Sequence, residues 1–210
     1  MELRFETAHR HHNECIGSLS LGVKIGETYT DYSQGSVRQT GGTYDLALSG
    51  SGFFAVSVTD KAGEVHTRYT RDGRFHLTKD GLLVDADGNA VQGQNGNITI
   101  DPSSKNVSIS ATGQITADGE LVDTLNIVDF EDYDYLKKYG DTMYEPVDGA
   151  TTKDAEGEIL QGYTEQSNVN VVREMVDMIT ITRAYEASQK VIHSYDSMLD
   201  KSVNQVGALK

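Results

Sequence analysis

Residues 167–206 follow a helical pattern of apolar and polar positions and contain neither glycine nor proline. Alternate steps of four and three from Val171 give a seam in which eight of eleven positions are apolar, a pattern typical of coiled coils. We predict an assembly interface along this seam. The predicted interface positions are seven of the eight apolar ones, namely Val171, Met175, Met178, Tyr185, Ile192, Leu199 and Val203.

A flanking row that includes Ile181, Val191 and Met198 widens the apolar stripe. Asn168 or Asn170 suits the N-cap of the helix, and Gly207 suits its stop. Roughly 36 helical residues would span ~54 Å. The stripe could be buried within the subunit's own fold, but a short β domain cannot cover that length. We therefore expect packing between subunits.

The preceding chain has the pattern of an antiparallel β domain. Short apolar segments are separated by turn pairs such as Asp72-Gly73, Asp80-Gly81 and Asp118-Gly119, whose residues tolerate positive φ. The spacing predicts a β-sandwich or barrel-like domain. The expected strands are 46–48, 53–58, 65–69, 74–77, 82–84, 97–100 and 125–130.

We divide the chain into three parts. Residues 1–25 are irregular, 26–165 form the β-rich domain, and 166–210 hold the C-terminal axial helix. The predicted fold class is mainly β with a long C-terminal α-helix of coiled-coil character. Within the β-rich part, a tyrosine-rich helix or loop is expected around Tyr133, Tyr135, Tyr139 and Tyr144.

Charge is unevenly distributed. The net charge is −14, and residues 118–165 contain 14 acidic side chains against 3 lysines. Nucleic-acid binding is therefore disfavoured, because phosphate contact needs a basic surface. No apolar run approaches the ~20 residues of a membrane span, so no membrane insertion is expected.

Candidate chemical sites are weak. Residues 50–55 (GSGFFA) fit a loose dinucleotide fingerprint, but a β-rich run follows the glycines where a helix is required. Asp85, Asp87 and Asn89 resemble the start of a calcium loop, yet Ala90 and Gly96 stand where glycine and glutamate are needed. We expect turns at both places, with no catalytic residues and no cofactor.

A histidine cluster near the start of the chain is the remaining candidate for metal binding. His9, His11 and His12 lie close to Glu14 and Cys15. Adjacent His11 and His12 point apart in either a helix or a strand, and no second cluster completes a site. We interpret them as surface residues and expect no metal.

Several segments of the chain carry more specific motifs, namely 29–36 (YTDYSQGS), 45–54 (DLALSGSGFF), 69–75 (YTRDGRF), 81–91 (GLLVDADGNAV) and 161–179 with 183–186 (RAYE). These segments resemble the flagellar hook and basal-body rod family, above all its rod proteins. The match covers about residues 25–110 and 160–206, in the expected order. The motif positions are Asp45, Gly50, Gly52, Phe53, Phe54, Arg71, Gly73, Ser167, Asn168, Arg183 and Tyr185.

The resemblance implies a non-enzymatic axial subunit that is exported by the flagellar type III apparatus and stacks into a rod. Its terminal helices would form the inner tube and its β domain would lie outside. The implied partners are copies of itself and other rod or hook subunits, with basal-body ring proteins or cell wall as further contacts. The implied location is the flagellar basal body, in the cell envelope or outside the cell.

One departure from the family pattern is at the start. Family members begin with a helix carrying an Asn-Leu-Ala-Asn-like motif, and residues 1–22 contain nothing similar. We expect a truncated form, a misplaced start or a divergent paralogue. A second hypothesis for function is a non-catalytic adaptor that contacts ring or cell-wall components through residues 118–165. An enzyme, such as a wall hydrolase, is disfavoured.

Overall fold

The computed structural model describes residues 2–4, 18–20, 29–60 and 63–206. It divides into two units, 1–33 and 34–210, which are treated separately. In the first unit, β1 (Glu2–Arg4) pairs antiparallel with β2 (Ser18–Ser20). The rest of the segment expected to be irregular lies outside the described residues, as do His9, His11 and His12.

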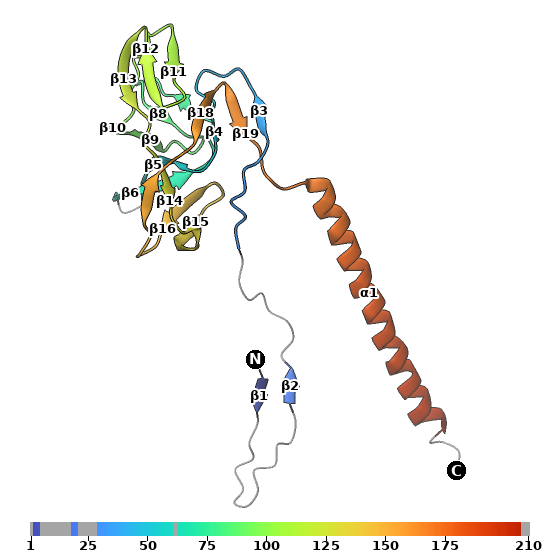
Figure 1. Ribbon diagram of the computed structural model, residues 1–210. Coiled ribbons are helices and arrows are strands. Elements are labelled where there is room, and N and C mark those ends of the chain that lie inside the picture. The colour runs from blue at the N-terminus through green and yellow to red at the C-terminus, as the bar shows by residue number, and fades with distance from the viewer. Residues whose placement is uncertain (1, 5–17, 21–28, 61–62, 207–210) are drawn as a thin grey trace, which may run out of the picture. The chain divides into compact units, whose positions relative to one another are not determined.

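The second unit is rich in antiparallel strands and ends in one long helix (Figure 1). Its helices are η1 (Tyr133–Tyr135), α1 (Val171–Lys201) and the π-helical turn η2 (Ser202–Val206). Its strands are β3 (Val37–Gln39), β4 (Leu46–Ser49), β5 (Phe53–Thr59), β6 (Val65–Thr70), β7 (His76–Leu77), β8 (Leu83–Val84), β9 (Ala90–Gly93), β10 (Gly96–Asn97), β11 (Val107–Ile109), β12 (Gln114–Ala117), β13 (Glu120–Thr124), β14 (Ile127–Phe130), β15 (Leu136–Tyr139), β16 (Met143–Pro146), β17 (Thr152–Asp154), β18 (Glu158–Gln161) and β19 (Tyr163–Glu165).

The largest sheet runs in the order β15-β16-β6-β5-β9-β8-β7, with β14 also pairing with β5. Three smaller sheets complete the unit: β11-β12-β13, β18 with β4, and β19 with β3. All of these pairs are antiparallel, and the described strands close no barrel. The predicted fold class, a mainly β domain followed by a long C-terminal helix, is confirmed.

The main core lies between β5 and the smaller sheets. Alternate residues of a strand point to opposite faces, so Phe54, Val56 and Val58 share one face of β5. They pack with apolar residues from five other strands, β4, β8, β9, β12 and β18, namely Leu46, Leu48, Leu83, Val91, Ile115 and Ile159.

The opposite face of β5 carries a second, aromatic cluster. Phe53 makes edge-to-face contacts with Phe130, Tyr133 and Tyr144, at centroid distances of 6.1, 5.9 and 5.5 Å. Tyr69 stands edge-on to Phe130 at 4.9 Å. Such pairs contribute about 0.5–1.5 kcal/mol beyond the area that they bury. This cluster packs residues 130–144 of the acidic stretch against β5 and β6.

Asp129 ties the aromatic cluster to the edge strand β17. Its carboxylate is fully buried, accepts hydrogen bonds from the Phe130 amide and the Tyr133 hydroxyl, and lies 3.1 Å from Lys153 Nζ. Burial pushes the pKa of Asp129 upward. The hydrogen bonds from Tyr133, Phe130, Ser51 and Lys153 outweigh burial, so the pKa lies below its ordinary value.

Several local predictions need correction. The expected tyrosine-rich helix or loop is the short η1 followed by the hairpin β15–β16, because Tyr144 pairs with Tyr69 across the sheet. The expected strand 74–77 shortens to β7, and Arg74 forms only an isolated bridge with Asp45. The expected strand 97–100 reduces to β10 and a bridge between Thr99 and Leu82.

The turn predictions at two glycine-rich sites agree with the structure. Gly50 and Gly52 occupy the turn between β4 and β5, with φ of 118° and 126°. At the β8–β9 turn, Asp85 Oδ1 accepts the amides of Asp87 and Asn89. These turns explain the residues that resembled a dinucleotide loop and a calcium loop.

Replacement of Gly73 by alanine should destabilise the β domain severely. A Cβ at Gly73 would overlap the carbonyl oxygen of Leu46, whose amide also donates to Gly73 O. We expect Gly73→Ala to lower the free energy of unfolding by about 3 kcal/mol. Urea unfolding followed by the near-ultraviolet dichroism of the tyrosines measures this.

The matched control is Gly88→Ala. Gly88 has φ of 88° but open space around its Cβ position, so only backbone strain of about 1 kcal/mol applies. Equal effects of the two substitutions would contradict the close packing of Gly73 on Leu46.

Asp129 should make the β domain sensitive to acid. Because its pKa in the folded protein is depressed, its contribution is present above the unfolded value near 4 and is lost as pH falls through the folded value. Asp129→Asn should lower the Tm at pH 7. Between about pH 5 and 3, the Tm of the variant should fall less than that of the parent protein. The exposed Asp148→Asn serves as control, and an unchanged Tm profile for Asp129→Asn would refute the assignment.

Candidate assembly interface

Helix α1 begins with the cap that its sequence favours. Asn170 Oδ1 accepts the amides of Val172 and Arg173, at 3.1 and 3.2 Å, and Glu174 lies in the first turn near the positive end of the helix dipole. Of the two predicted caps, Asn170 is therefore the one used. The predicted stop at Gly207 lies outside the described residues.

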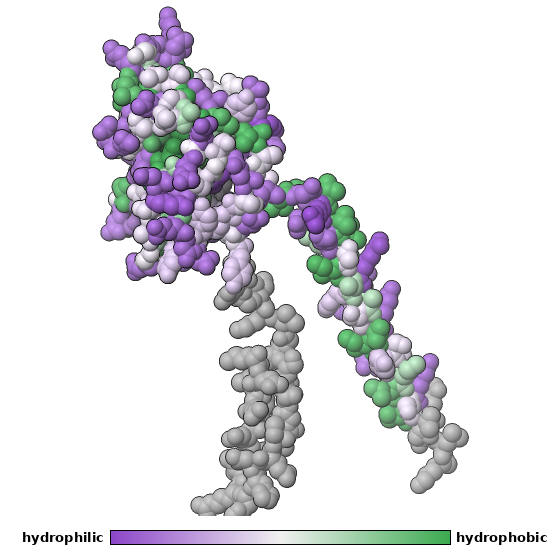
Figure 2. Space-filling model, in the orientation of Figure 1, coloured by the Kyte–Doolittle hydropathy of each residue, from purple (hydrophilic) through white to green (hydrophobic). Residues whose placement is uncertain are grey.

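The side chains of α1 are exposed along its whole length. Its 31 residues span ~46 Å, and none of them is buried. Its large apolar residues, and Val203 beyond its end, are 53–72% exposed, including all seven predicted seam positions. Figure 2 shows hydrophobic residues along α1 interspersed with hydrophilic ones at the surface. Full burial of one such side chain stabilises by about 1.5–3 kcal/mol, so a partner would stabilise the helix strongly.

The strand pair β3–β19 positions the start of α1. Val37 pairs with Glu165 and Gln39 with Tyr163, so the segment that enters the β domain lies beside the segment that leaves it (Figure 1). One further hydrogen bond, from the Gln166 amide to Ser36 O, extends the pairing by a residue. Gly35 packs so closely on the carbonyl of Gln166 that a Cβ there would overlap it.

Arg71 clamps this strand pair to the β4–β5 turn. Its Nε lies 3.0 Å from Glu165 Oε2, and the two side chains are only 20% and 11% exposed. Its Nη1 donates to the carbonyls of Gly50 and Gly52, and its guanidinium lies 5.9 Å from the Phe53 ring centroid. Glu165 Oε1 also accepts the Gly35 amide. One ion pair therefore joins three segments of the chain.

Two polar side chains complete the junction. Gln34 donates to Leu48 O and accepts the Gly50 amide. Gln161 donates to Thr43 O and Val107 O and accepts the Ile109 amide. Gln34 satisfies two backbone groups of the segment 48–50, and Gln161 satisfies backbone groups of two segments, which orders the junction without a large apolar core.

The predicted motif positions fall into three groups. Asp45, Gly50, Gly52, Phe53, Phe54, Arg71 and Gly73 lie in or beside the junction and its underlying core. Ser167 and Asn168 lie in the exposed connection to α1, where Ser167 Oγ accepts the Val169 amide. Arg183 and Tyr185 are exposed on α1. Sequence reasoning did not single out Glu165 and Gln34, because neither belongs to a periodic pattern and their partners are distant in sequence.

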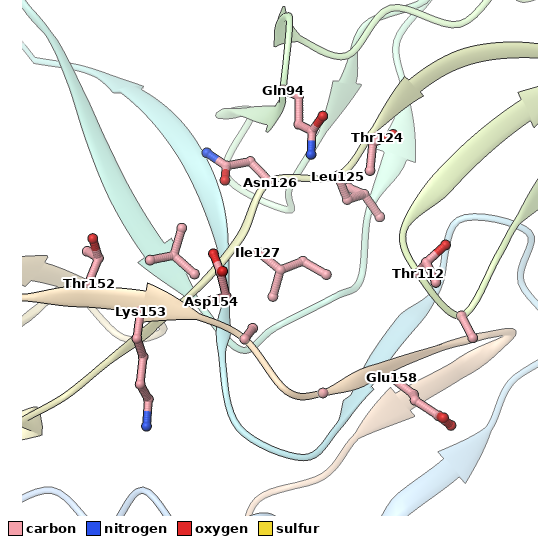
Figure 3. Close-up of a pocket in the computed structure, with 14 residues that line it drawn as sticks. Gln94, Thr112, Thr124, Leu125, Asn126, Ile127, Thr152, Lys153, Asp154 and Glu158 are labelled. Atoms are coloured by element: carbon pink, nitrogen blue, oxygen red, sulfur yellow. The ribbon is translucent and has the colours of Figure 1, made fainter.

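A polar groove of about 810 Å³ lies beside β14, β17 and β18. Figure 3 shows Gln94 and Asn126 at one end, with Lys153 and Glu158 pointing away from Ile127. Among the described residues, its lining contains no histidine, cysteine or serine. The groove offers amides, hydroxyls and carboxylates for hydrogen bonding.

Two features are absent from the described part of the chain. No group of three or more His, Cys, Asp or Glu side chains is arranged to hold a metal ion there. No helix there combines the length and hydropathy that a membrane span requires.

Two family models match the chain. The one described as "Flagellar hook protein FlgE/F/G D1 domain" matches residues 47–117, which carry most of the core and the Arg71 clamp. The one described as "Flagellar basal body rod FlgEFG protein C-terminal" matches residues 160–206, which carry β19 and α1.

Similar proteins include two of FlgG type and one of FlgF type. The flagellar basal-body rod protein FlgG of Buchnera aphidicola subsp. Schizaphis graminum is 36% identical over 196 residues, covering 87% of this chain and 73% of that protein. Bacillus subtilis FlgG is 32% identical over 205 residues, covering 89% and 74%. Caulobacter vibrioides FlgF, also a basal-body rod protein, is 34% identical over 181 residues, covering 85% and 72%. The chain therefore belongs to the flagellar basal-body rod protein family.

Proposed function

We propose that this protein is a structural, non-enzymatic subunit of the flagellar basal-body rod that polymerises through α1. The observation that carries the proposal is the complete exposure of a 31-residue helix with apolar side chains along its length. A monomer that kept this surface in water would forgo several times the 1.5–3 kcal/mol available per buried side chain. Assembly supplies the missing contacts.

The β domain has the properties of a support for that helix. Its core and aromatic cluster are extensively packed, and the Arg71–Glu165 pair fixes the strand from which α1 starts. A rigid junction sets the direction in which the connection leaves the domain. The proposal therefore includes the predicted division of the chain into a β-rich domain and an axial helix. The predicted seam positions form the interface of the proposed assembly.

The proposed partners are further copies of the chain and other rod or hook subunits. Contacts with basal-body ring proteins, cell wall and the flagellar export apparatus are a further part of the proposal, as is a location in the cell envelope. The alternative function, a non-catalytic adaptor, has weaker support. Two tyrosines of the stretch 118–165 that this alternative would use, Tyr133 and Tyr144, pack in the aromatic cluster around Phe53.

Acidic substitutions within the apolar stripe should abolish self-association. In Met178→Glu with Leu199→Glu, two charges would have to be buried in the assembly, which costs far more than the apolar contacts return. Sedimentation velocity and electron microscopy of concentrated protein should show polymers for the parent chain and small species for the variant. A strain lacking the gene should swim when supplied with the parent chain and not with the variant.

The matched control is His193→Glu with Ser197→Glu, which adds two carboxylates among the polar residues of the second half of α1. It should assemble and support swimming. Normal polymers from the Met178 and Leu199 variant would refute assembly through this stripe.

Loss of Arg71 should loosen the start of the helix while leaving the main core folded. Arg71→Met leaves the largely buried Glu165 carboxylate without its ion-pair partner, and we expect the free energy of unfolding to fall by about 2–3 kcal/mol. Hydrogen exchange should accelerate selectively in β3 and β19. The double variant with Glu165→Gln should recover part of the loss, because it removes the unpaired charge. Uniform acceleration throughout the domain would contradict a local clamp.

A further inference from the structure

The apolar residues of α1 separate into two groups along its length. The first group, in residues 171–179, consists of Val171, Val172, Met175, Val176, Met178 and Ile179. The second, in residues 181–199, consists of Ile181, Ala184, Tyr185, Val191, Ile192, Tyr195, Met198 and Leu199. All of them are exposed.

The two groups point to different sides of the helix. At ~100° per residue, their mean directions differ by about 160°, close to half a turn. Underwinding to ~3.5 residues per turn reduces the difference to about 120°. The heptad line through Val171, Met178, Tyr185, Ile192 and Leu199 runs along the border between the groups. A single seam therefore describes only this shared border.

The charged residues follow the same division. Arg173, Glu174 and Asp177 lie on the side that the second group occupies farther along the helix. Beyond residue 179, the side of the helix that carries the first group becomes polar, with residues such as Arg183, Glu186 and Lys190. The crossover falls at Thr180, whose hydroxyl donates to Val176 O. Each side of α1 thus has an apolar part and a charged part, and the two sides have them in opposite order along the helix.

A single straight partner helix in one register cannot cover both groups, because it would meet apolar residues over one half and charges over the other. Two neighbours on opposite sides can. The first group spans nine residues and the second nineteen, with centres about 15 residues or ~22 Å apart along the axis. If a neighbouring α1 helix is displaced along the axis by ~22 Å, its second group lies beside the first group of the original helix.

A second copy of this chain has the chemistry to occupy both faces. Residues 171–201 contain 4 basic and 5 acidic side chains, a net charge of −1, whereas residues 34–170 contain 10 basic and 22 acidic ones, a net charge of −12. Helices of nearly zero net charge do not repel one another, and each copy brings both apolar groups. The acidic β surface offers no such apolar match.

We propose that α1 is a two-faced connector: residues 171–179 of one copy dock on residues 181–199 of the next, on opposite sides of each helix. The inference rests on the proposed function and adds to it the polarity of the contact. A contact between two different faces is heterologous and leaves one of each face open at the ends of a chain of subunits. The assembly then grows without closing into a dimer.

The test uses two full-length variants, each with one disabled face and the same added charge. The first is Val172→Asp with Val176→Asp, and the second is Val191→Asp with Tyr195→Asp; all four positions avoid the shared border. Each pair should weaken self-association by about 100-fold or more, since two buried apolar side chains are lost. Sedimentation velocity and native mass spectrometry are applied to each variant alone and to their equimolar mixture.

The expected result is that the parent chain forms polymers, each variant alone is a monomer, and the mixture forms 1:1 heterodimers through the two intact faces. Heterodimer formation also shows that both variants remain folded. Homodimers from either variant alone would mean that each face binds its own copy, which overturns the inference and leaves assembly through α1 standing. A mixture that stays monomeric while the parent chain polymerises overturns it as well. A monomeric parent chain would instead contradict the proposed self-assembly itself.

Discussion

The burial of apolar surface on α1 is the requirement on which the organisation of this protein depends. A soluble helix normally places its apolar stripe on its own domain, but here every residue of α1 is exposed. The β domain has its own core and therefore does not need the helix for stability. The two parts can serve separate purposes: one supplies a stable support and the other a surface for association.

The junction between the β domain and α1 is close-packed and polar, whereas the core of the β domain is apolar. Arg71, Glu165, Gln34 and Gln161 satisfy backbone groups from several segments, and Gly35 and Gly73 allow backbone contacts that any side chain would block. Such a polar arrangement fixes the direction of the chain at the junction better than an apolar contact does, because hydrogen bonds are directional whereas hydrophobic burial is not.

Much of the fold could be read from the sequence because its signals are local. The Asp-Gly turns, the apolar run at β5 and the helix period at α1 each depend on neighbouring residues. The strands β15 and β16 could not be predicted from the sequence, because Tyr144 is held by pairing with Tyr69, which is far away in the chain. The same holds for Glu165, which acquires its role only when β19 meets Arg71. The seam on α1 was predicted as one row because a heptad count follows the border line and not the change of side at Thr180.

The register of β3 and β19 has a mechanical consequence. The outer end of this ladder is the hydrogen bond from the Gln166 amide to Ser36 O, and the pair Val37–Glu165 lies next to it. Tension that separates the two leaving segments would peel the ladder from that end, breaking its hydrogen bonds one after another instead of loading them together. Glu165 is the residue that Arg71 grips. The ion pair thus reinforces the second rung of the ladder, so that once the outermost hydrogen bond opens, the pull on the helix passes through Arg71 into the sheet.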